Sequence, residues 1–204
     1  MGDPHAFAAD VFHTVCDRLA ERAADLYHLV AADAPFGGWL EGEAFLACRG
    51  RQAASGWCEV AARPTYGSEG VTVAAGRAAA DRGALRVGGS GEPGDHRWLF
   101  AEVVLLLDGD GRLGDWRART EAAAARLLRL GWKRSAAVLI VVAAGRGDVA
   151  ADWADDLAGL PAWHRPALAD PVVLGLPGGG SVAVRAADVK RDPAHTLTSA
   201  AGPG

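Results

Sequence analysis

The chain has 204 residues, half of them hydrophobic, which is enough to bury the core of one ordinary domain. A net charge of −4 gives no global attraction to nucleic acid or to an anionic membrane. Three cysteines without a C-x-x-C pair argue against a disulfide framework and a cysteine-rich zinc site. There is no membrane-spanning apolar run and no signal-peptide pattern, so we expect a cytoplasmic protein without membrane contact. Abundant Ala, Gly and Arg point to a high-GC bacterium.

The first half of the chain predicts a helix followed by short strands. Apolar side chains recur every three to four residues over 4–32, which is typical of one long helix with a buried stripe. From residue 39 to residue 87, short apolar runs separated by glycine predict strands paired as antiparallel hairpins. The expected strands are Trp39–Cys48, Trp57–Ala62, Val71–Ala74 and Ala84–Val87.

The second half is organised around residues 98–144. Two continuous apolar runs flank a glycine turn and a helix, which predicts a βαβ unit with parallel strands covered on both faces. A short helix, Asp152–Leu160, and a hairpin of Pro171–Leu176 with Ser181–Val189 follow. We therefore expect residues 1–190 to form one α/β domain with a mixed sheet, and residues 191–204 to form a disordered tail.

Glu102 interrupts the otherwise apolar run Leu99–Leu107. An isolated buried carboxylate costs on the order of several kcal/mol, so Glu102 needs a partner, a cation or an exposed end. A helix, a small antiparallel sheet, an acid within a strand, a helix and another apolar strand follow one another here. In this element order, residues 5–144 resemble the restriction-endonuclease-like (PD-(D/E)XK) fold.

The resemblance implies a metal-dependent nuclease or phosphodiesterase. In that family carboxylates bind Mg²⁺ or Mn²⁺, which polarises the scissile phosphate and activates water. Glu102 would be the strand acid, Asp81 or Asp95 the preceding aspartate, and Glu21 the acid of the first helix. The motif lysine is absent, because two valines follow Glu102. The resemblance therefore implies a degenerate or rebuilt active site.

A glycine turn supplies a second hypothesis. Gly109, Gly111 and Gly114 match GxGxxG between a strand and a helix, the context of a dinucleotide-binding turn. Arg146 lies near the end of the next strand, where an arginine would favour the 2′-phosphate of NADP. Two aspartates within the turn put negative charge where phosphates would lie. We favour a simple strand-to-helix turn and keep an NADP-binding, oxidoreductase-like protein as the alternative.

Three further patterns concern partners and metals. Basic side chains on and after the central helix could bind an acidic protein or the phosphates of nucleic acid: Arg117, Arg119, Arg126, Arg129, Lys133 and Arg134. The alternative is an amphipathic helix with its arginines in water. The pairs Asp10–His13 and Asp25–His28 have metal-binding spacing, but a solvated helix face is the simpler interpretation. Seven tryptophans suit packing in the core and at its rim.

Each catalytic pattern in the chain lacks an essential member. We therefore predict a non-catalytic or catalytically degenerate binding protein, without a cofactor, that acts through a macromolecular partner. The most direct partner is another protein, with nucleic acid as the alternative through the basic side chains. A metal-dependent nuclease with Mg²⁺ or Mn²⁺ and an NADP-binding protein remain the rival functions.

Overall fold

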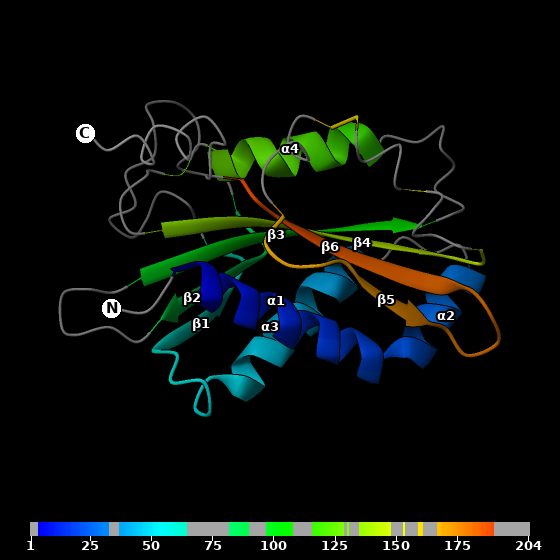
Figure 1. Cartoon of the computed structure of the whole chain (residues 1–204), viewed down its shortest axis with the longest axis horizontal. Coiled ribbons are helices and arrows are strands. Elements are labelled where there is room, and N and C mark those ends of the chain that lie inside the picture. Colours follow the sequence, from blue (N-terminus) through cyan, green and yellow to red (C-terminus); the bar gives the residue numbers. More distant parts are fainter. Residues whose placement is uncertain are drawn as a thin grey trace, which may run out of the picture.

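A computed structural model describes residues 4–32, 37–64, 82–89, 97–107, 116–128, 130, 135–147, 153, 159–160 and 167–189. They form a six-stranded mixed sheet between two layers of helices (Figure 1). Helices α1 (Pro4–Glu21), α2 (Ala23–Ala31) and α3 (Gly37–Arg51) cover one face, and α4 (Trp116–Leu128) covers the other. The predicted α/β class is therefore confirmed. Within the described residues, no helix has the length and apolarity to cross a bilayer.

The strands are β1 (Glu59–Ala62), β2 (Leu85–Gly89), β3 (Arg97–Leu107), β4 (Ser135–Gly145), β5 (Val172–Gly175) and β6 (Ser181–Asp188). They lie in the order β1-β2-β3-β4-β6-β5. Only the central β3–β4 pair of these described strands is parallel, and the other four pairs are antiparallel. The predicted βαβ crossover through α4 and the final hairpin are both confirmed.

The central strands are buried on both faces, which explains their continuous apolar sequence. Odd-numbered side chains of β3, such as Leu99 and Leu105, pack under α1, α2 and α3. Even-numbered ones, such as Phe100 and Leu106, pack under α4. Successive side chains of a strand point to opposite faces, so Glu102 faces α4.

The predicted helix over 4–32 is two segments that meet at Arg22. Its amide N–H donates to Arg18 O at 3.1 Å and Leu19 O at 3.2 Å, and Leu26 N–H donates to Arg22 O at 3.0 Å, so hydrogen bonding continues through the bend. The predicted apolar stripe faces the sheet, as expected. Its buried members are Val11, Val15, Leu19, Leu26 and Val30.

The predicted strand Trp39–Cys48 is wrong, because these residues lie in α3. Leu40, Ala44 and Cys48 recur every four residues and are buried, which is the pattern of one helix face. Glycine inside a helix costs about 1 kcal/mol relative to alanine, and the burial of this face outweighs that cost. β1 and β2 match two of the remaining predicted strands. Val71–Ala74, most of Asp152–Leu160 and residues 191–204 lie outside the described residues.

The packing of α1 against α3 predicts which thiols react. Cys16 and Cys48 are buried, and burial raises the pKa of each thiol to about 12, whereas Cys58 is exposed. Only the thiolate is reactive, so the native protein at about pH 8 should react with one equivalent of a thiol reagent, and with three after unfolding. A spectroscopic titration measures this. Rapid modification of more than one thiol in the native protein would contradict the packing of α1 on α3.

Candidate functional site at the start of β2

Glu102 meets Arg126 of α4 on the face of the sheet that α4 covers. Arg126 Nε donates to one carboxylate oxygen at 2.9 Å, and Nη2 donates to the other at 2.8 Å. The Glu102 side chain is 4% exposed and that of Arg126 is 31% exposed. Paired hydrogen bonds between guanidinium and carboxylate are among the strongest polar contacts in proteins. The crossover helix thus supplies the partner that the sequence of β3 requires.

Glu102 also lies where the sheet becomes narrower. β2 pairs with β3 only as far as Leu85, which lies opposite Ala101. Among the described residues, β3 beyond Ala101 has a strand neighbour only in β4. The connection from β1 stays close to the start of β2, since Arg63 N–H donates to Ala84 O at 3.1 Å. We call the place where the β2–β3 pairing stops the step. No further described strand lies between the charged side chains there.

Glu41 of α3 is a second carboxyl group whose charge is coupled to that of the Glu102–Arg126 pair. Burial raises its pKa, and Glu102 adds to the shift, while Arg63 and Arg126 oppose it. Glu41 therefore senses the charges of Glu102 and Arg126, although α3 and α4 cover opposite faces of the sheet (Figure 1). Sequence reasoning missed Glu41 because it placed residues 39–48 in a strand. We call Glu41, Arg63, Glu102 and Arg126 the step cluster.

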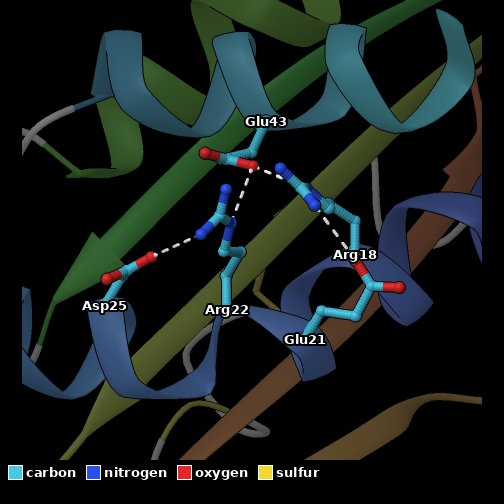
Figure 2. A network of polar contacts seen from close by, with 5 residues as sticks. All are labelled: Arg18, Glu21, Arg22, Asp25 and Glu43. Atoms are coloured by element: carbon cyan, nitrogen blue, oxygen red, sulfur yellow. Dashed lines mark hydrogen bonds and ion pairs between the residues drawn. The ribbon is translucent and has the colours of Figure 1, made fainter. Parts of the chain in front are cut away.

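Glu21, the helix acid implied by the resemblance, lies elsewhere. Figure 2 shows it at the end of α1, where Arg18 Nη1 donates to it at 3.1 Å, and its side chain is 67% exposed. Arg18 Nε also donates to Glu43 of α3 at 2.7 Å, and Arg22 Nε lies 3.5 Å from the same Glu43 oxygen. Because α1 covers the face opposite to α4, the structure does not bring Glu21 to Glu102.

Other predicted site residues lie outside the described residues: Asp81, Asp95, Gly109, Gly111, Gly114, Arg129, Lys133 and Arg134. Leu107 pairs with Ala144, so β3 and β4 end side by side, as a dinucleotide-binding turn would require. Arg146 follows β4, and its Nη2 donates to Ala31 O at 3.2 Å. Ala31 ends α2, and a cation is favourable at a helix C-terminus. A contact between Arg146 and a 2′-phosphate stays a prediction.

The described part of α4 does not present its arginines as one surface. Arg117 is exposed and lies over the Trp116 ring, Arg119 is half-buried, and Arg126 turns toward Glu102. The exposed positions of α4 are Arg117, Ala118, Glu121, Ala122, Ala125 and Leu128. Most of these exposed side chains are small and apolar, and the charged ones are Arg117 and Glu121.

The predicted metal pairs on α1 and α2 are engaged with arginines. Asp10 lies 3.6 Å from Arg51, and Asp25 lies 3.5 Å from Arg22. In the part of the chain that the structure describes, no group of three or more His, Cys, Asp or Glu could hold a metal ion. The five tryptophans of the same segments are buried or half-buried, so they pack in the core and at its rim.

Comparison with family models, curated proteins and solved structures finds no match to this chain. The described elements follow one another as helices, the antiparallel strands β1 to β3, α4 and the parallel strand β4, and the resemblance to restriction-endonuclease-like proteins stays a prediction. That order concerns the fold alone. The step cluster is therefore the candidate functional site.

The helix junction in Figure 2 predicts a stability effect. Glu43→Gln should lower the free energy of unfolding by about 1–3 kcal/mol, because Arg18 and Arg22 lose the ionised group on which both converge. Glu21→Gln is the matched control, since Glu21 is 67% exposed and its loss should cost less than about 0.5 kcal/mol. Urea unfolding followed by tryptophan fluorescence compares the two variants. Equal losses would contradict the central place of Glu43 in the junction.

The environment of Glu41 predicts a pH dependence. Because its pKa is raised in the folded state, mainly by burial, stability falls as the pH rises from the unfolded pKa through the folded pKa. Glu41→Gln removes this loss, so the variant should gain stability near pH 7 and show almost no gain near about pH 3. Urea unfolding at both pH values measures the difference, with the exposed Glu121→Gln as a charge control. A less stable Glu41→Gln at neutral pH would contradict the account.

Proposed function

We propose that the chain is a catalytically degenerate binding protein of restriction-endonuclease-like fold, which acts in the cytoplasm through a protein partner and without a cofactor. The observation that carries the proposal is the bidentate pairing of Glu102 with Arg126. The resemblance gives Glu102 the place of a metal ligand. A guanidinium fixed on both of its oxygens supplies the positive charge that a metal ion would bring.

The residues at the step fit a divalent cation poorly. Mg²⁺ and Mn²⁺ take oxygen ligands, and both oxygens of Glu102 accept hydrogen bonds from Arg126. A metal ion would have to displace charge-assisted bonds to a carboxylate that is 4% exposed. Glu21 lies on the other side of the sheet, and valine stands where the motif has lysine. These features support the loss of metal-dependent phosphodiester cleavage.

The surface of α4 favours a protein partner over nucleic acid. Ala118, Ala122 and Ala125 are exposed in a row, and Leu128 beside them is 42% exposed. Nucleic-acid binding depends on several lysines and arginines that reach phosphates, whereas Arg126 is engaged with Glu102. Glu121 adds a negative charge to the same exposed surface. The overall charge of −4 supports the same choice.

Cleavage and binding assays with nucleic acid test this function. Single- and double-stranded DNA and RNA should stay intact with the wild-type protein in Mg²⁺ or Mn²⁺, and Glu102→Gln should behave identically. Fluorescence anisotropy should show no binding of labelled DNA or RNA at physiological salt. Mn²⁺-dependent cleavage that disappears in Glu102→Gln would overturn the proposal in favour of the nuclease. Thermal stabilisation by NADP that disappears in Gly111→Val would overturn it in favour of the dinucleotide-binding alternative.

A further inference from the structure

Strand β5 directs backbone hydrogen-bonding groups away from the sheet. Among the described strands it is the outermost one on its side, and it pairs with β6. The hairpin between them closes with Leu176 N–H donating to Gly180 O at 3.1 Å, so the backbone groups of Leu176 face β6. These groups alternate in direction along an antiparallel strand. Those of Leu174 therefore face β6 as well, whereas those of Val173 and Gly175 point outward, where another strand could pair with them.

The side chains of β5 are apolar on both faces of the sheet. Val172 and Leu174 pack against the core under α1, α2 and α3. Val173 therefore points to the face that carries α4, and it is 55% exposed, more than any other large hydrophobic side chain of the described residues. Gly175 points to the same face and leaves open space there, since a Cβ at this position would have no atom beyond its chain neighbours within 4 Å. An exposed aliphatic side chain and an unfilled position thus lie two residues apart on one edge.

The β5 edge also lacks the charges that usually keep edge strands apart. Residues 171–184 contain no charged side chain. Pro171 and Pro177 lack an N–H group, so they limit an added ladder to the residues between them without blocking Val173 or Gly175. Two copies of a chain with a net charge of −4 repel each other overall, and a neutral edge lets them meet without like charges in contact.

We infer that β5 is a dimerisation edge, at which two copies of the chain join their sheets through antiparallel β5 strands related by a two-fold axis. With the axis at Leu174, Val173 of one copy lies opposite Gly175 of the other, and each such pair exchanges both of its N–H···O bonds. The Val173 side chain then covers the open space beside Gly175, and the two Leu174 side chains meet on the other face. Asp170 lies opposite Gly178, so no like charges face each other directly.

This self-complementarity is the reason why the occupant is a second copy. A single short segment supplies the outward donors and acceptors, the exposed side chain and the space that receives it. The inference goes beyond the proposed function and does not depend on the step cluster, because β5 lies at the side of the sheet away from β2. It also leaves the exposed surface of α4 available to another protein.

Sedimentation velocity of the full chain, from micromolar to near-millimolar concentration, tests the inference. The paired segment is short, so we expect a reversible dimer with a Kd of about 100 µM or tighter. Val173→Pro removes an outward N–H and no hydrogen bond of the β5–β6 ladder, so it should fold and weaken dimerisation at least about tenfold. Val173→Thr is the matched control, since it keeps the N–H and the branched shape and should dimerise like the wild type.

A wild type that stays monomeric at every concentration would overturn the inference, as would a folded Val173→Pro that dimerises like the wild type. Circular dichroism shows whether Val173→Pro folds. If it does not, Val173→Lys decides, because a lysine on an edge strand opposes pairing. Dimerisation of Val173→Lys at least about tenfold weaker than that of the wild type supports the inference, and undiminished dimerisation overturns it.

Cysteine cross-linking tests the position of the two-fold axis. Cys58→Ser first removes the exposed native thiol. At the axis the two Leu174 Cα atoms would lie about 4.5 Å apart, which is within the range of a disulfide. Leu174→Cys should therefore form a covalent dimer when diamide oxidises the two thiols, whereas Val172→Cys, two residues from the axis, should not. Cross-linking of Val172→Cys alone, or of neither variant, would overturn the inference.

Discussion

The pairing of Glu102 with Arg126 is the constraint that links the central strand to the crossover helix. β3 is covered on both faces, so a carboxylate on it cannot reach bulk water and must be neutralised locally. Arg126 lies at the edge of the buried face of α4, three residues after Ala123 and next to Leu127, both of which pack on the sheet. From this position its guanidinium reaches the carboxylate of Glu102 beneath the helix. The pair thereby joins α4 to β3 and neutralises the charge of Glu102.

Helix α3 carries acidic side chains on two of its sides. Glu41 and Glu43 are about 200° apart around a helix axis. Glu43 accepts from Arg18 and lies beside Arg22 at the bend between α1 and α2 (Figure 2). Glu41 instead senses the step cluster, whose Arg126 belongs to the opposite helix layer. Glu43 therefore joins α3 to α1 and to the α1–α2 bend through two arginines, whereas the charge of Glu41 is coupled to the step cluster.

The sequence predicted the parts of the fold where a single periodicity dominates. The continuous apolar runs of β3 and β4 and the stripe from Val11 to Val30 have one physical interpretation each, and the structure confirms them. Helix α3 was missed because Gly37, Gly38 and Gly42 resemble loop punctuation, while the compensating burial of Leu40 and Ala44 depends on tertiary packing.

In the candidate site, too, one feature could be predicted from the sequence, whereas others depend on tertiary packing. The need of Glu102 for a partner follows from its apolar neighbours, but Arg126 was grouped with the surface arginines because its orientation depends on the rotation of α4. A search for basic residues at the border of the buried face of the crossover helix would have found it. Glu41 could not be found in this way, since its relation to Glu102 depends on where β2 begins. The residue at which β2 begins cannot be read from the local sequence.

The most direct test of the central claim is a crystal structure of the wild-type protein grown in millimolar Mn²⁺, with anomalous scattering used to locate the ion. The account predicts that both oxygens of Glu102 remain hydrogen-bonded to the Arg126 guanidinium and that no anomalous peak lies beside Glu102. An anomalous peak coordinated by Glu102, with Arg126 displaced, would contradict the account and would identify a working metal site at the start of β2.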